Sequence, residues 1–189
     1  MIRRNLLSIA LVALATVACS TTTTSDSPGD AASKRRTIDT SVDGALTKLY
    51  SQVKGSREMV AKSKAVLVFP AVLSAGFGVG GSYGEGSLRA GARTLGYYNT
   101  VAGSVGLLAG ADSKALYVLF MNQESLDKFT SSNGWTAGAD ASVTLLTTGA
   151  DAGVDTQTAQ QGVVGYALSN AGLMVNLSLD GTKVTKLDL

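Results

Sequence analysis

AGFGVGGSYGEG, residues 75–86, is the stretch that decides how the chain folds. Its first part, Gly76–Gly81, satisfies the G-x-G-x-x-G spacing of a dinucleotide-binding turn and follows a predicted strand, as such a turn does. A dinucleotide site also needs a helix directly afterwards, because the helix N-terminus holds the pyrophosphate. Residues 82–86 are too rich in glycine to begin one. We therefore interpret the stretch as a β-strand whose glycines permit strong bending or a close backbone approach.

Strand-like sequence continues on both sides of this stretch. Ala65–Phe69 and Ala115–Met121 are continuous apolar runs, the first ending at Pro70, and both are consistent with buried strands. Between them lie segments of strand-like composition that are broken by glycine: Gly76–Gly86, Thr94–Asn99 and Val101–Gly110. The middle of the chain is therefore expected to form a sheet.

The C-terminal end has the pattern of a β-hairpin. Leu173–Leu179 and Lys183–Leu187 are strand-like and flank the turn pair Asp180-Gly181. A hairpin joins strands that run in opposite directions, so we expect a largely antiparallel sheet.

The main predicted helix precedes the sheet. It covers residues 38–54 and stops at Gly55. Apolar residues at three- and four-residue spacing form its single stripe: Ile38, Val42, Ala45, Leu46, Leu49 and Val53.

Two shorter helices are predicted as well. One covers residues 56–62, with Ser56 as N-cap and Glu58 in the first turn, where the helix dipole favours an acid. The other covers residues 123–130, and Asn122 can cap it. Together the elements predict one α+β domain over residues 38–189, in which N-terminal amphipathic helices pack on a glycine-rich, largely antiparallel β-sheet or partly closed barrel.

Residues 1–18 have the composition of a secretory signal peptide. Arg3 and Arg4 precede the apolar run Leu6–Val17, and the small residue Ala18 ends the segment. The apolar run is too short to span a bilayer core comfortably, which takes about 20 residues. The chain is therefore expected to be exported from the cytoplasm.

Cys19 directly follows Ala18 and resembles the lipid-modified cysteine of a bacterial lipobox. In that pattern the thiol is diacylated before cleavage, and several acyl chains anchor a protein firmly. Ordinary cleavage nearby, with an incidental cysteine, is the alternative. Ser20 resembles the outer-membrane sorting signal of such lipoproteins, so we expect an outer-membrane anchor in a bacterial envelope, with the domain facing the periplasm or the surface. Residues 19–37 then serve as a flexible tether.

The composition argues against an enzyme. The absence of histidine removes the commonest general base, the commonest metal ligand and every Ser-His or Cys-His pair. The acid pairs Asp151/Asp155 and Glu124/Asp127 lack the density of oxygen ligands found in a calcium loop. No G-x-S-x-G elbow is present. We therefore predict no catalytic residue, no metal and no cofactor.

Basic residues are concentrated between Lys34 and Lys64, where eight of them accompany three acidic residues. Five are candidates for lipid binding: Lys48, Lys54, Arg57, Lys62 and Lys64. They form either a solvated helix surface or a contact with anionic headgroups, to which each basic residue contributes about 1 kcal/mol. Nucleic acid is not an expected partner, because the chain is exported and has no interleaved aromatic residues.

Several short motifs are spread over residues 38–189: Phe69-Pro70, Ala75–Gly86, Gly96-Tyr97-Tyr98, Leu119-Phe120-Met121, Leu126-Asp127-Lys128-Phe129, Gly134-Trp135 and Gly172-Leu173-Met174. In this order they resemble SYLF-domain (Ysc84-type) proteins, the actin-binding and lipid-binding modules of fungal and animal endocytic proteins. The resemblance implies a phospholipid-binding rather than a catalytic domain. In eukaryotic relatives a basic, amphipathic N-terminal segment is credited with lipid binding, and that role would fall here on the helices between Ile38 and Lys64.

Two functions follow as hypotheses. In the first, a non-enzymatic envelope lipoprotein contacts an anionic phospholipid membrane through its basic N-terminal helices. In the second, the glycine-rich sheet of a structural or adaptor lipoprotein binds another envelope protein, which requires an exposed apolar patch on the sheet. A third, an unrecognised hydrolase, requires polar residues that converge in a pocket.

Overall fold

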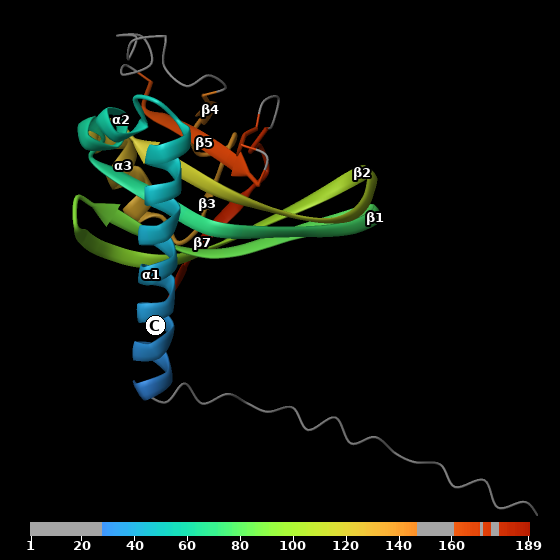
Figure 1. Cartoon of the computed structure of the whole chain (residues 1–189), viewed down its shortest axis with the longest axis horizontal. Coiled ribbons are helices and arrows are strands. Elements are labelled where there is room, and N and C mark those ends of the chain that lie inside the picture. Colours follow the sequence, from blue (N-terminus) through green and yellow to red (C-terminus); the bar gives the residue numbers. More distant parts are fainter. Residues whose placement is uncertain (1–27, 147–160, 171, 175–177) are drawn as a thin grey trace, which may run out of the picture.

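The computed structural model describes residues 28–146, 161–170, 172–174 and 178–189 (Figure 1). The helices in these residues are α1 (Pro28–Gln52), α2 (Ser56–Lys62) and α3 (Gln123–Ser131). The strands are β1 (Ala65–Ala90), β2 (Arg93–Phe120), β3 (Trp135–Thr136), β4 (Thr144–Leu145), β5 (Val163–Ser169), β6 (Gly172–Leu173) and β7 (Lys183–Leu187). The predicted signal segment and Cys19 lie outside the described residues.

The described strands form one sheet in which β2 and β5 each pair with three other strands. In the described residues the hydrogen-bonded order is β3-β7-β2-β5-β4, with β1 paired to β2 and β6 paired to β5. Every pair is antiparallel except β4 with β5. β7 pairs with β2 at Tyr97–Val101, and β5 pairs with it at Ala115–Phe120. The predicted α+β fold with a largely antiparallel sheet is confirmed.

β1 and β2 form a long two-stranded ribbon that bends back on itself, as Figure 1 shows at the labels of the two strands. The two halves of β1 come into backbone contact as a result. A Cβ atom at Gly84 would lie 2.8 Å from the carbonyl oxygen of Ala71, and one at Gly86 would collide with the carbonyl oxygen of Val68. Only glycine permits so close an approach, which is the role predicted for the glycines of residues 75–86.

The two long strands differ from the predicted series of short ones. The predicted segments merge, because glycine interrupts their apolar composition without interrupting their backbone pairing. The predicted strand end at Pro70 is wrong, since β1 continues past it through a register shift between Phe69 and Val72. Proline has no N–H to donate, and a bulge is one of the few places in a strand that accommodates it.

The sheet carries a hydrophobic core on each face. α1 crosses the ribbon (Figure 1) and packs on one face through a stripe of buried residues: Ile38, Val42, Ala45 and Leu49, with Val53 directly after the last residue of the helix. The predicted stripe is thus confirmed, with Leu46 only partly buried. On the other face an aromatic cluster surrounds Phe129 of α3, whose ring centroid lies 4.8 Å from that of Phe120 and 4.9 Å from that of Tyr98.

α1 begins ten residues earlier than predicted, at Pro28, and so includes part of the segment assigned to the tether, residues 19–37. Proline suits the first helical position, where its missing N–H costs no hydrogen bond, and Asp30 in the first turn complements the helix dipole. Lys34 in this extension forms an ion pair of 2.9 Å with Glu85 on β1. The apolar stripe begins only at Ile38, so apolar periodicity alone could not locate this start.

The two shorter helices lie close to their predicted bounds. α2 covers the predicted residues, but Gly55 with a φ of 79° occupies its N-cap position and not Ser56. The Ser56 hydroxyl donates instead to the carbonyl oxygens of Val53 at 2.6 Å and Leu49 at 3.2 Å, which closes the end of α1. Asn122 caps α3 as predicted and accepts from a backbone N–H at 2.9 Å.

The predicted C-terminal hairpin is only partly correct. β7 matches its predicted strand, and the turn is present because the Thr182 N–H donates to the Leu179 carbonyl at 2.9 Å. Before the turn, the described residues contain the two-residue strand β6, which pairs with β5, while β7 lies between β2 and β3. Residues 175–177 lie outside the described part. Pairing with the long strand β2 has overridden the local hairpin signal.

Candidate functional site

The five predicted lipid-binding residues lie in two places. Four are exposed and lie on α2 or within two residues of its ends: Lys54, Arg57, Lys62 and Lys64. We call these four the α2 basic cluster. Glu58 is the one acidic residue within positions 54–64. Lys48 is half-buried on α1 and lies apart from the cluster.

The α2 basic cluster is fixed to α1 through an aromatic ring. The guanidinium carbon of Arg57 lies 4.5 Å from the ring centroid of Tyr50, which is a cation–π contact. Burial raises the pKa of the Tyr50 hydroxyl, and the positive charge of Arg57 opposes part of this shift. Tyr50 therefore stays neutral at physiological pH, and the contact does not depend on its ionisation.

A second set of charges fastens α1 to the ribbon. Arg89 on β1 is 10% exposed in its side chain and contacts Asp39 at 3.2 Å and Asp43 at 3.1 Å. Asp39 also accepts from the hydroxyls of Thr94 at 3.1 Å and Tyr97 at 2.9 Å. Burial raises the pKa of Tyr97, and its hydrogen bond to Asp39 adds to this. Two of the acidic residues of α1 are thus paired with the ribbon, which leaves them less able to offset basic charge elsewhere.

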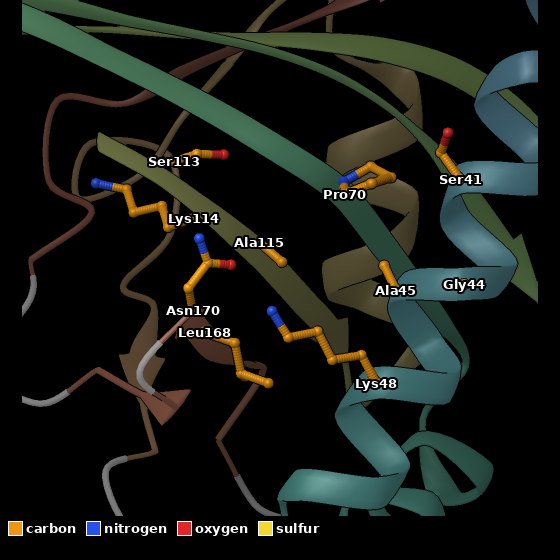
Figure 2. Close-up of a pocket in the computed structure, with 10 residues that line it drawn as sticks. All are labelled: Ser41, Gly44, Ala45, Lys48, Pro70, Ser113, Lys114, Ala115, Leu168 and Asn170. Atoms are coloured by element: carbon orange, nitrogen blue, oxygen red, sulfur yellow. The ribbon is translucent and has the colours of Figure 1, made fainter. Parts of the chain in front are cut away.

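Lys48 lines a cleft between α1 and the sheet (Figure 2). Its ammonium nitrogen lies 3.5 Å from the carbonyl oxygen of Ser169 at the end of β5. The cleft has a volume of about 200 Å³, and its lining also includes Lys114 of β2 and Asn170. Sequence reasoning missed Lys114, because it lies far from Lys48 along the chain and no local pattern marks it.

The ribbon carries exposed apolar side chains that the sequence did not single out. Phe77 is 89% exposed and Val79 is 70% exposed. Together with three further exposed residues they form what we call the ribbon patch: Leu73, Phe77, Val79, Tyr83 and Val101. Tyr83 and Val101 are register partners on the two strands. The glycine-broken composition predicted a strand here but could not show which of its faces other elements cover.

Of the acid pairs considered for acid–base or metal chemistry, the described pair, Glu124 and Asp127, makes other contacts. Glu124 forms an ion pair of 2.8 Å with Lys128, and Asp127 accepts a hydrogen bond of 2.8 Å from Gln123. Asp151 and Asp155 lie outside the described residues. In the part of the chain that the structure describes, no group of three potential ligands could hold a metal ion.

A larger cavity of about 350 Å³ lies beside Val72 and Leu116. Among the described residues that line it, the side-chain hydrogen bonds join only Ser178 and Asp180. The Ser178 hydroxyl donates to the Asp180 carboxylate at 2.9 Å and accepts from the Asp180 N–H at 3.1 Å, both local contacts within a turn. No base-activated nucleophile is visible in these lining residues. None of the helices in the described ranges combines the length and the apolar character needed to cross a bilayer.

The α2 basic cluster, the ribbon patch and the clefts are surface features typical of a domain that binds other molecules. Residues 101–188 match the family model Ysc84, described as Las17-binding protein actin regulator. The match confirms, over this part of the chain, the predicted resemblance to the Ysc84 (SYLF-domain) family. A binding role rather than a catalytic one accords with this family. No curated protein matches the chain significantly.

Proposed function

We propose that this chain is a lipoprotein of the bacterial envelope whose Ysc84 domain binds anionic phospholipid through the α2 basic cluster. The observation that carries the proposal is the gathering of four exposed basic side chains around one short helix, with a single acidic residue among them. Each basic residue near an anionic surface contributes about 1 kcal/mol, so four together give a reversible but measurable attraction.

Lipid attachment at Cys19 would strengthen this weak attraction. Eight residues separate Cys19 from Pro28, the start of α1, and they reach at most about 28 Å. A tether of this length keeps the domain beside the membrane and raises the effective concentration of headgroups at the cluster.

The tether also limits how the domain is oriented. α1 has 25 residues and is about 38 Å long, and α2 follows its C-terminal end. An upright α1 with α2 at the membrane would place Pro28 beyond the reach of the tether. The proposed contact therefore requires α1 to incline toward the membrane plane.

Vesicle co-sedimentation tests the membrane proposal. The sample is the chain from Ser20 onward, which keeps every described residue but lacks the lipid anchor. In about 0.1 M salt it should sediment with phosphatidylglycerol vesicles and not with phosphatidylcholine vesicles. The double variant Lys62→Glu/Lys64→Glu should bind at least about 30-fold more weakly, because it removes about 2 kcal/mol of attraction and adds repulsion.

A matched control reverses two exposed lysines of β7, Lys183→Glu/Lys186→Glu. Both double variants change the net charge equally, so only a local contact distinguishes them. We expect the β7 variant to bind nearly as well as the unaltered chain. An equal loss of binding in both variants would mean that net charge alone determines vesicle binding, and this would contradict a binding site at α2.

The ribbon patch favours a second candidate function, an adaptor that binds another envelope protein through its sheet. This function requires exposed apolar side chains on the sheet, and the ribbon patch supplies them, with Phe77 89% exposed. A photo-crosslinking residue placed at Phe77 in cells should then capture one defined envelope protein, whereas the same residue at Lys186 should not. Capture of lipid alone, or of nothing at either position, would reject the adaptor function.

A further inference from the structure

The larger cavity lies on the face of the sheet that carries the aromatic cluster, opposite α1. Three register pairs of the ribbon line it: Val72–Lys114, Ser74–Asp112 and Ser82–Ala102. The first two pairs lie in one half of the bent ribbon, and the third lies in the other half. Paired residues of an antiparallel ribbon point to the same face. The bend therefore places the inner faces of both halves around one space.

Lys114 belongs to this inner face. Its register partner is the core residue Val72, and Figure 2 shows its ammonium group directed away from Lys48. The side chain is half-buried, and within the described ranges neither an ion pair nor a hydrogen bond engages it. The acidic residues of the lining, Asp112 and Asp180, are both exposed. The charge of Lys114 is thus available to an anion that enters the cavity.

The cavity is apolar where its lining is most deeply buried. Val72, Leu116 and Leu179 line it and are at most 6% exposed. Thr100 is 1% exposed and presents a methyl group as well as a hydroxyl. The charged residues of the lining, by contrast, are half-buried or exposed. An apolar interior with a few polar groups is typical of pockets that bind small organic molecules.

The size of the cavity sets the size of such a molecule. Its volume of about 350 Å³ is within the range of roughly 300–1,000 Å³ found for ligand pockets. An apolar cavity of about 150 Å³ holds benzene, so one carbon atom takes about 25 Å³. At this ratio the cavity accommodates a chain of up to about 14 carbon atoms.

We propose that the larger cavity binds the hydrocarbon chain of a single-chain amphiphile, with the anionic end of that molecule paired to Lys114. Burial of each methylene group favours binding, and the ion pair fixes which end of the molecule stays at the rim. The two exposed carboxylates oppose an anion only weakly, because water and salt screen them.

The amphiphile is either a fatty acid or a lysophospholipid, which share the chain and the negative charge. The inference goes beyond the proposed membrane contact, since it involves none of the residues of the α2 basic cluster and requires no vesicle.

A chain-length series tests the size of the site on the chain from Ser20 onward. Saturated fatty acids from octanoate to octadecanoate are titrated below their micelle-forming concentrations and followed by NMR. The amide signals of Val72, Thr100 and Leu116 should shift. The affinity should rise about fourfold for each added methylene group and level off near about 14 carbon atoms.

Two tryptophan substitutions on adjacent residues test the location. Ala102→Trp introduces an indole into the cavity and should weaken dodecanoate binding at least about tenfold, because it displaces two or more methylene groups. Val101→Trp is the matched control, since Val101 is 48% exposed and does not line the cavity. Ser82→Leu, at the register partner of Ala102, is a smaller filling that should move the levelling of the series to shorter chains.

Substitutions of Lys114 test the pairing of the anion. Lys114→Met keeps most of the apolar stem and should weaken dodecanoate binding about tenfold, because a charged hydrogen bond is lost. Binding of the uncharged dodecanol should stay unchanged, and Lys114→Arg should retain dodecanoate binding. An equal effect of Lys114→Met on both compounds would contradict the pairing.

A lysophosphatidylglycerol that carries a dodecanoyl chain distinguishes the two sources. Tighter binding of this compound than of dodecanoate assigns the chain to a lysophospholipid, and weaker binding assigns it to a free fatty acid.

Three results would overturn the cavity. They are the absence of shifts in its amide signals, equal effects of Ala102→Trp and Val101→Trp, and an affinity that rises by the same factor up to octadecanoate, as adsorption to a surface would give. Lys62→Glu/Lys64→Glu should bind dodecanoate like the unaltered chain, so the cavity and the α2 basic cluster are tested separately. Loss of dodecanoate binding in that variant would assign the anion to α2 instead. Thermal melts verify that each variant is folded.

Discussion

Gly86→Ala is expected to destabilise the domain by about 3 kcal/mol, the upper part of the range for overpacked cores. The added Cβ would collide with the carbonyl oxygen of Val68 and lie 2.9 Å from the Phe69 ring. Val68 belongs to the other half of the bent strand β1 and is itself buried. Neither half can move away freely, because both are paired with β2 and the backbone on each side is fixed by hydrogen bonds.

Gly103→Ala provides the matched control for this change. Gly103 lies on β2 of the same ribbon, and a Cβ there meets no atom within 4 Å. We expect its effect to stay within about 0.5 kcal/mol, as for other surface substitutions. Urea unfolding followed by the fluorescence of Trp135, the single tryptophan of the chain, measures both variants. Equal stability of the two variants would contradict the close backbone approach between the two halves of β1 at Gly86 and Val68.

Phe129→Ala is expected to cost about 4 kcal/mol of stability. Phe129 is 2% exposed and is the one residue of α3 whose ring contacts three aromatic partners, Tyr98, Phe120 and Trp135. The substitution removes a large buried side chain and all three ring contacts, each worth about 0.5–1.5 kcal/mol beyond its buried area.

The neighbouring residue supplies the control for Phe129→Ala. Thr130 is exposed on α3 and its hydroxyl donates only to carbonyls of its own helix. Thr130→Ala should therefore change the free energy of unfolding by less than about 0.5 kcal/mol. A loss of stability below about 1 kcal/mol in Phe129→Ala would contradict the packing of α3 against the aromatic cluster on this face of the sheet.

Local sequence patterns predicted the elements whose determinants are themselves local. The stripe that begins at Ile38 showed which face of α1 is buried, and Asn122 marked the start of α3. The glycines of residues 75–86 indicated a bent strand with close backbone contact. Each of these signals depends on residues within a few turns or strand positions of each other.

The remaining features depend on contacts between distant segments. Arg89 forms an ion pair with Asp39 only because the ribbon packs against α1, and no sequence pattern near either residue predicts the pair. Lys114 and Asp180 likewise line one cavity although they are distant in sequence. The N-terminal extension of α1, which begins at Pro28, is linked to the sheet by the Lys34–Glu85 ion pair, again a contact between distant residues.

Fluorescence from a probe on α2 tests the central claim most directly. The chain from Ser20 onward has no cysteine, so Glu58→Cys and Lys186→Cys each provide a single labelling site for an environment-sensitive dye. On addition of phosphatidylglycerol vesicles, the account predicts a blue shift for the dye on α2 and none for the dye on β7. A shift at β7 alone, or vesicle binding with no shift at α2, would contradict membrane contact through the α2 basic cluster.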